Sequence, residues 1–144
     1  MSVTVLYETK AVATGNREGD GMAETLDGSL KLNLAAPKEL GGSGNGNNPE
    51  EIFAVGYAAC FIGAMKAVAS KSEYLKLPAD AKATATVGIG PYSEGGYGLK
   101  VSLDVSLPGL EKAAAEELVQ KAHEVCPYSN ATRGNVDMEL SVSV

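Results

Sequence analysis

The chain of 144 residues contains two cysteines and one histidine, and these three residues could do nucleophilic chemistry. Cys60 and Cys126 lie far apart in the sequence and in no CxxC motif, and His123 stands close to the second cysteine. A zinc site would need four ligands of suitable spacing, and the sequence lacks them. Free cysteine is also a common core residue, so Cys60 alone allows an inert structural role. The same residues allow a Cys–His hydrolase if the fold brings His123 to Cys60.

Cys60 lies in the middle of residues 49–72, the stretch around which the chain is organised. Within residues 52–65 no charged side chain interrupts the sequence, and many Ala and Gly residues indicate a helix rather than a strand. The run is shorter than the roughly 20 residues that span a bilayer, so we expect a core helix and no membrane association. Asn48 can cap this helix, and Glu50 suits the positive end of its dipole.

The central helix is apolar on every face and therefore needs cover on every face. Six short strands with one polar face each and one Ala-rich helix provide limited cover. Gly56 and Gly63 would also let another backbone approach closely. We therefore predict an obligate two-fold homodimer in which the central helices of two copies pack together.

Composition predicts one domain over residues 1–144. The net charge is −6 and the only arginines are Arg17 and Arg133, which argues against a nucleic-acid-binding surface. The first ten residues lack a basic segment followed by an apolar one, so we expect no export and a cytoplasmic location.

The hydrophobic patterns predict an α+β chain in the order βββ-α-ββ-α-β. Alternating strands with one polar face favour sheets that are largely antiparallel. The glycine-rich stretch 36–48 lacks a GK[ST] ending, so we interpret it as a flexible connection rather than a phosphate-binding loop. The expected elements are strand character over residues 3–13, a polar turn at 14–21, strands at 22–27 and 30–34 joined by a turn at Asp27-Gly28, the central helix, a loop at 73–80, strands at 82–89 and 99–107 joined by a turn at 91–96, a helix at 110–125 ended by Pro127, and a strand at 136–144.

Three segments resemble the organic hydroperoxide resistance (Ohr) branch of the OsmC/Ohr superfamily. They are PEEIFAVGYAACF, ATGNREG and CPYSNATRGN, and the similarity extends over essentially the whole chain. The last segment discriminates best, because the sister OsmC branch differs after its second cysteine. The resemblance implies a thiol-dependent peroxidase that reduces organic hydroperoxides, with an intertwined homodimer and active sites at the subunit interface.

The resemblance also implies four site residues. Cys60 matches the cysteine that attacks the peroxide, and Cys126 matches the resolving cysteine that forms a disulfide with it. Arg17 matches the active-site arginine, and Glu50 matches the glutamate that pairs with this arginine. The resemblance implies no bound cofactor, and it implies a lipoyl group carried on a protein as the dithiol reductant.

These residue types are consistent with the implied chemistry. A thiol of ordinary pKa is only about 3% ionised at pH 7, and an apolar helix would lower that fraction further. A cation near Cys60 is therefore required, and Arg17 cannot lose its proton. Glu50 would hold that arginine in place. Because Glu50 precedes Cys60 by about 15 Å of helix rise, we expect it to come from the partner subunit.

Two alternatives of other classes stay open from sequence. The chain could be a thiol-based sensor or small-molecule binding module without turnover, or the Cys60–His123 hydrolase. The aromatic and apolar neighbours of Cys60 would favour a fatty or aromatic hydroperoxide, although most of them could be core residues: Phe53, Tyr57, Phe61 and Met65.

Overall fold

The computed structural model describes residues 2–15 and 18–144, which form two compact units, Met1–Pro49 and Glu50–Val144. The proposal of one domain over residues 1–144 stays a prediction.

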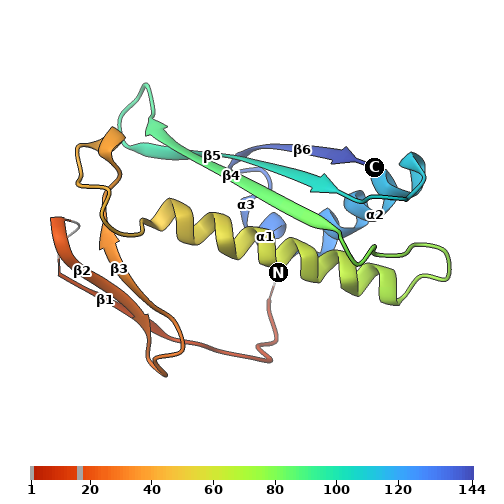
Figure 1. Ribbon diagram of the computed structural model, residues 1–144, viewed down its shortest axis with the longest axis horizontal. Coiled ribbons are helices and arrows are strands. Elements are labelled where there is room, and N and C mark those ends of the chain that lie inside the picture. Colours follow the sequence, from red (N-terminus) through yellow and green to blue (C-terminus); the bar gives the residue numbers. More distant parts are fainter. Residues whose placement is uncertain (1, 16–17) are drawn as a thin grey trace. The chain divides into compact units, whose positions relative to one another are not determined.

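The first unit is an antiparallel sheet of three strands in the order β1-β2-β3 (Figure 1). Its strands are β1 Ala11–Thr14, β2 Glu18–Thr25 and β3 Lys31–Ala35. The prediction of strand structure from residue 3 was wrong, because residues 3–10 pair with no strand in the described part of the chain and are exposed. The predicted polar turn at 14–21 is also shorter, because β2 already begins at Glu18 and pairs with β3.

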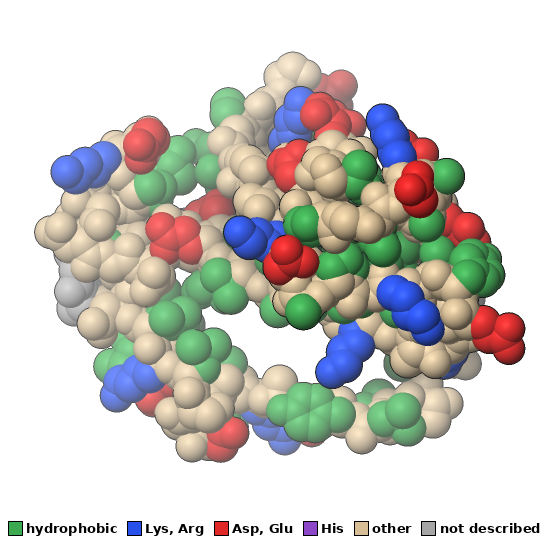
Figure 2. Space-filling view, turned by 45° about the vertical axis from the view of Figure 1, so that its right-hand side comes forward, with side chains coloured by type: hydrophobic (Ala, Val, Ile, Leu, Met, Phe, Trp, Pro, Cys, Tyr) green, Lys and Arg blue, Asp and Glu red, His purple; other side chains and the backbone are tan. Residues whose placement is uncertain are grey.

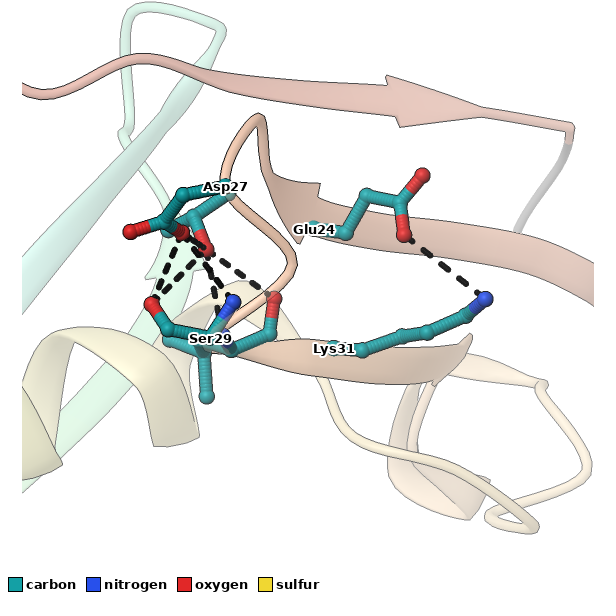
Figure 3. A network of polar contacts seen from close by, with 6 residues as sticks. Glu24, Asp27, Ser29 and Lys31 are labelled. Carbon is teal, nitrogen blue, oxygen red and sulfur yellow. Dashed lines mark hydrogen bonds and ion pairs between the residues drawn. The ribbon is translucent and has the colours of Figure 1, made fainter.

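The predicted turn at Asp27 is confirmed and connects β2 to β3 (Figure 3). One carboxylate oxygen of Asp27 accepts hydrogen bonds from the Thr25 hydroxyl at 2.7 Å and from the Ser29 amide at 3.0 Å and hydroxyl at 2.8 Å. These donors, with the Thr25 hydroxyl first, lower the pKa of Asp27 from 3.8 to about 2. Glu24 and Lys31, paired across the two strands, form an ion pair at 3.6 Å.

The glycine-rich connection after β3 is hydrogen-bonded back onto the sheet, contrary to the predicted flexible segment. It contains a short 3₁₀ helix, η1 Lys38–Leu40. The Ala35 amide donates to the Asn47 carbonyl at 2.9 Å, and the Asn47 amide donates to the Asn33 carbonyl at 2.8 Å. Gly46 lies so close to this strand that a Cβ atom there would be 2.7 Å from the Asn33 carbonyl oxygen. The glycines therefore permit close packing of backbone rather than mobility.

The second unit contains the central helix, a three-stranded sheet and two further helices (Figure 1). The elements are α1 Pro49–Ser70, β4 Lys82–Pro91, β5 Tyr97–Ser106, α2 Lys112–Val125, α3 Pro127–Thr132 and β6 Asp137–Ser143. The helix over 49–72 and the last three strands are confirmed close to their predicted bounds. The short helix α3 was not predicted.

The sheet of the second unit is mixed, because β4 and β5 pair antiparallel while β5 and β6 pair parallel. Parallel neighbours need a long crossover connection, and here α2, Cys126 and α3 form it. The crossover positions the second cysteine, because it returns the chain across the face of the sheet that packs on α1.

Helices α1 and α2 bury their apolar side chains with the central strand β5 in one core. Fully buried large side chains of these three elements are Tyr57, Phe61 and Met65 of α1, Val101, Leu103 and Val105 of β5, and Leu118 and Val119 of α2. In α1 only Tyr57, Phe61, Ala64 and Met65 are buried, whereas Val55 is 72% exposed. The packing of a second copy of the chain against the exposed faces of α1 stays a prediction.

By length and composition α1 could also cross a bilayer. That is weak support for a membrane span, because the core helix of a soluble protein has the same properties. On the face shown in Figure 2, acidic and basic side chains are interspersed with hydrophobic ones, and the basic side chains do not gather in one patch.

Candidate active site

The two cysteine thiols, far apart in the sequence, meet in the second unit. The Cys126 thiol donates a hydrogen bond to the Cys60 sulfur, with 3.4 Å between the two Sγ atoms, and both cysteines are free. A disulfide bond is about 2.05 Å long, so a small approach of the two sulfurs would join them. Cys126 is fully buried, whereas Cys60 is partly exposed. Of the two sulfurs, Cys60 is therefore the one open to a small molecule.

Cys126 is held rigidly because it forms the junction of two helices. Its amide donates to the Ala122 carbonyl of α2 at 2.8 Å, and its carbonyl accepts from the Asn130 amide of α3 at 2.9 Å. Pro127 ends α2 because it has no amide hydrogen to continue the helix, and the same residue begins α3. The backbone of the buried cysteine is thus fixed on both sides.

The surroundings of Cys60 act on its pKa in opposite directions. Burial is the largest effect and raises the pKa of the Cys60 thiol above 9.0, because the apolar environment disfavours the thiolate. The backbone N–H of Tyr128, in the first turn of α3, donates towards the sulfur and lowers the pKa. The neighbouring Cys126 raises it again. On balance the described residues raise the pKa of Cys60, which favours the thiol over the thiolate near pH 7.

Tyr128 reaches Cys60 because Gly56 leaves room on α1. A Cβ atom at Gly56 would be 2.7 Å from the Tyr128 hydroxyl oxygen and 3.2 Å from two ring carbons. The Tyr128 ring packs against Phe53 and Tyr57, with centroid distances of 5.8 and 5.6 Å. Gly56 therefore has a positioning role towards α3, in addition to the role in helix packing that the sequence suggested.

A chain of hydrogen bonds connects the three helices beside the cysteine pair. His123 of α2 lies 2.9 Å from the Ser129 hydroxyl of α3, measured from Nδ1, and this hydroxyl lies 2.9 Å from the Tyr57 hydroxyl of α1. Tyr57 and Ser129 are fully buried. In the described part of the chain the side-chain polar contact of Cys60 is with Cys126, and the His123 ring contacts Ser129. This arrangement disfavours the Cys60–His123 hydrolase.

A pocket of ≈ 350 Å³ opens beside the Cys60 sulfur. It lies between α1 and the junction of α2 and α3, and among the described residues Lys71 is its one charged lining residue. The other lining residues are apolar or small: Gly63, Ala64, Ala67, Val68, Val125 and Pro127. Among residues 2–15 and 18–144, no three His, Cys, Asp or Glu side chains cluster as metal ligands would. The pocket therefore suits the apolar part of a small molecule whose reactive atom faces Cys60.

Similarity to known proteins covers nearly the whole chain. The OsmC-like protein family matches residues 42–141. An organic hydroperoxide resistance protein of Xanthomonas axonopodis pv. citri (strain 306) is 54% identical over 140 residues, which cover 96% of each chain. The chain belongs to the Ohr branch of the OsmC/Ohr superfamily.

Solved structures of Ohr proteins have the same fold. An organic hydroperoxide resistance protein from Legionella pneumophila has a TM-score of 0.90 and 52% identity, covering 98% of this chain and 100% of that one. The OhrB protein of Bacillus subtilis has a TM-score of 0.83 and 39% identity, covering 96% and 100%. The predicted Ohr-like α+β fold is thereby confirmed. Membership of the Ohr family is consistent with a role in peroxide detoxification.

The structure places the four site residues implied by the Ohr resemblance in different ways. Cys60 and Cys126 are brought together, as described above. Glu50 lies in the first turn of α1, and its Oε2 atom is buried without a hydrogen-bond partner among the described residues. Arg17 lies outside the described residues. The roles of all four in catalysis stay predictions.

Two residues near the Ohr cysteine pair, Tyr128 and Ser129, were not predicted to position it. Tyr128 donates its amide to Cys60, and Ser129 connects His123 to the central helix. Tyr128 and Ser129 belong to the segment CPYSNATRGN, which gave the most specific signal of the sequence. That signal could have directed attention to them, but only the fold shows which atoms they contact.

Proposed function

We propose that this protein is a thiol-dependent peroxidase that reduces organic hydroperoxides to alcohols. The observation that supports it best is the free thiol pair, with 3.4 Å between the sulfurs and only the Cys60 side open to a pocket. A two-cysteine peroxidase needs this difference in exposure, because one sulfur must contact the substrate while the other lies close enough to form a disulfide with it. The family name of the relatives agrees with this substrate class.

In the first step the Cys60 thiolate attacks the outer oxygen of the hydroperoxide. The O–O bond breaks, the sulfur gains one oxygen as a sulfenic acid, and the alkoxide takes up a proton and leaves as an alcohol. The apolar pocket beside Cys60 would accommodate the alkyl or fatty-acid part of the substrate. Hydrogen peroxide has no such part and gains nothing from this pocket.

In the second step the Cys126 thiol condenses with the Cys60 sulfenic acid. An S–S bond forms, the S–O bond breaks, and the oxygen leaves as water with the thiol proton. A dithiol then reduces the disulfide by thiol–disulfide exchange and is itself oxidised to a disulfide. We propose that the physiological dithiol is a lipoyl group on a protein, so no tightly bound cofactor is needed.

Arg17 and Glu50 have supporting roles in the proposed mechanism. The guanidinium of Arg17 would lower the pKa of Cys60, which burial raises, and would stabilise the departing alkoxide. Glu50 would orient this guanidinium. Helix α1 extends unbroken from Pro49 to Ser70, so Glu50 and Cys60 of one copy are separated by about 15 Å of helix rise. We therefore propose that the partner subunit's Glu50 completes each site in a cytoplasmic homodimer.

The decisive experiment is steady-state consumption of tert-butyl hydroperoxide and of a fatty-acid hydroperoxide with dihydrolipoamide as the reductant. We expect turnover that is much faster than with hydrogen peroxide and that Cys60→Ser abolishes. A thiol-based sensor would consume about one equivalent and stop. Absence of dithiol-dependent turnover would refute the proposed function.

The second cysteine is tested by Cys126→Ser. We expect one turnover followed by accumulation of sulfinic acid at Cys60, because no thiol remains in place to capture the sulfenic acid. A hydrolase that uses Cys60 and His123 would not need Cys126. Mass spectrometry of the treated protein measures the oxidation state, and unchanged recycling in this variant would contradict the resolving role.

Subunit sharing is tested by mixing Glu50→Ala chains with Cys60→Ser chains. If Glu50 acts across the interface, a heterodimer contains one site with both residues intact, and activity returns. If both residues act within one copy, neither site of the heterodimer is intact. No recovery of activity in a verified heterodimer would contradict the shared site.

A further inference from the structure

The hydrogen-bond chain beside the cysteine pair forms a brace between the helices that carry the two sulfurs. Tyr57 precedes Cys60 by about one turn of α1, and Ser129 follows Cys126 by about one turn of α3. The direct contact between their hydroxyls, at 2.9 Å, therefore connects the same two elements as the contact between the sulfurs. His123 continues this chain from α2, the helix that ends at Cys126.

We propose that His123 is a positioning residue, which donates its Nδ1 hydrogen to Ser129 and thereby holds Cys126 beside Cys60 for disulfide formation. This inference rests on the proposed peroxidase function for its kinetic consequence. The proposed direction of the hydrogen bonds, however, does not depend on that function. It follows from a count of the hydrogens that each hydroxyl can give.

The direction of the chain is set at its buried end by acceptors. Tyr57 contacts the Met138 sulfur at 3.0 Å, and a thioether sulfur can only accept. Tyr57 also lies 3.3 Å from the Thr132 hydroxyl, and the single hydrogen of Thr132 has two backbone acceptors within reach, the carbonyls of Tyr128 at 3.0 Å and Ser129 at 3.2 Å. With its hydrogen on one of these carbonyls, the Thr132 oxygen accepts from Tyr57. The proposed direction gives the Tyr57 hydrogen to one of these two acceptors, because the reverse direction, with Tyr57 donating to Ser129, leaves the Met138 sulfur at 3.0 Å without a donor.

This placement of the Tyr57 hydrogen determines the other two hydrogen bonds of the chain. Since the hydrogen of Tyr57 is used, its oxygen accepts the hydrogen of Ser129. Since the hydrogen of Ser129 is used, its oxygen must accept from His123, so Nδ1 of the imidazole carries a hydrogen. Burial, followed by the charge of Arg133, lowers the pKa of His123 below 6.5, so the ring is neutral near pH 7. Its second nitrogen, Nε2, is then without a hydrogen.

The brace should govern what happens to Cys60 after it has been oxidised. A sulfenic acid either condenses with Cys126 or reacts with a second peroxide to give sulfinic acid. Loosening the junction of α2 and α3 moves the buried Cys126 away from the sulfenic acid and favours the second reaction. The fraction of Cys60 that becomes sulfinic acid in each cycle is therefore the quantity that reports on the brace.

The tautomer can be measured directly because His123 is the only histidine. In the ¹⁵N spectrum of the reduced protein at pH 7, we expect a protonated Nδ1 and an unprotonated Nε2. The opposite tautomer would overturn the proposal. This readout does not depend on peroxidase activity, so it separates the brace from the proposed function. Should the wild-type protein fail to reduce organic hydroperoxides, the proposed function would fail while the tautomer result stood.

Two similar replacements test the direction of hydrogen donation. His123→Asn keeps an N–H donor near the position of Nδ1, whereas His123→Asp has nearly the same shape and offers only acceptors. Loss of one net hydrogen bond corresponds to a factor of about five. We expect the sulfinic acid fraction to rise about fivefold in the Asp variant and less than twofold in the Asn variant. Equal fractions in the two variants would overturn the proposal.

A Ser129→Ala background controls for the negative charge that His123→Asp adds near the end of α2. Without the Ser129 hydroxyl the donor has nothing to position, so the Asn and Asp variants should give equal sulfinic acid fractions there. If the Asp variant remains worse than the Asn variant in this background, charge rather than hydrogen donation causes the effect, and the proposal is wrong. Mass spectrometry after one addition of cumene hydroperoxide measures all six proteins, including the two parents.

Discussion

Replacing Gly56 by alanine adds a methyl group where Tyr128 crosses helix α1. The new Cβ atom would be 2.7 Å from the Tyr128 hydroxyl oxygen, whereas ordinary van der Waals contact begins at 3.4 Å. The ring is packed against Phe53 and Tyr57, at 5.8 and 5.6 Å between centroids, so an inward shift is blocked. Tyr128 is 38% exposed, and its ring can therefore relieve the contact only by moving outwards.

The expected cost in stability combines two opposing effects. Overpacking of this kind costs about 1–3 kcal/mol, and replacing Gly by Ala within a helix returns up to about 1 kcal/mol. The net loss of about 1–2 kcal/mol corresponds to a fall in Tm of about 2–8 °C for a chain of this size. The shift should also loosen the Tyr128 amide, which lowers the pKa of Cys60, so the pKa of Cys60 should rise in the variant.

The assay compares Gly56→Ala with Gly63→Ala in the same helix. A Cβ atom at Gly63 would have nothing within 4 Å in the described chain, so this variant should keep or slightly raise the Tm. The pH dependence of alkylation by iodoacetamide reports the pKa of Cys60. The reasoning is refuted if Gly56→Ala is as stable as the wild type and leaves the alkylation profile unchanged. A lower Tm in Gly63→Ala, together with dissociation, would instead indicate that a partner helix packs on Gly63.

Three further measurements test other parts of the structure. Arg17→Ala should raise the pKa of Cys60, because burial already raises it above 9.0 and the proposed guanidinium opposes that effect. An unchanged alkylation profile would contradict the role of Arg17. Hydrogen bonds lower the pKa of Asp27 from 3.8 to about 2, so its carboxylate stabilises the fold above pH 4 and ceases to do so as the pH falls towards 2. Asp27→Asn should therefore lose less stability over this interval than the wild type in urea titrations, and equal losses would contradict the assignment. Ala67→Phe should fill part of the ≈ 350 Å³ pocket and slow the reaction of Cys60 with cumene hydroperoxide more than with hydrogen peroxide. Equal slowing would show that the pocket does not hold the organic group.

Local sequence patterns predicted those elements whose signals are local. The apolar run of α1, the turn at Asp27 and the alternation in β4, β5 and β6 all lie within single stretches of chain. The strand prediction for residues 3–10 was wrong because an alternating sequence forms a strand only where a neighbouring strand supplies hydrogen bonds. Helix α3 was not predicted, for a different reason. Its six residues are too few for helical periodicity, and Pro127 signals the end of α2 as strongly as the start of α3.

The candidate site could be predicted only as far as single residues reveal chemistry. Cys60 and Cys126 stand out by residue type and by their Ohr-like segments, and their meeting at 3.4 Å follows from the crossover that brings α3 onto α1. The contact of Ser129 with Tyr57 depends on the same crossover, but serine and tyrosine have ordinary roles in most folds. No local pattern distinguishes a serine that braces two helices from one that faces solvent.

The change in stability caused by Glu50→Gln shows whether a cation lies beside the Glu50 carboxylate. Its Oε2 atom is buried without a hydrogen-bond partner among the described residues, a costly state for a carboxylate. If the proposed Arg17 pairs with it, Glu50→Gln leaves a guanidinium without its counter-charge, and stability should fall by about 1–3 kcal/mol. If no cation is present, the neutral amide removes an unfavourable buried charge, and stability should rise. Urea unfolding at pH 7 measures this sign, and comparison in an Arg17→Ala background separates the pair from other effects of the amide. A rise in stability would refute the pairing on which the activation of Cys60 depends, because the same guanidinium is proposed to hold the thiolate.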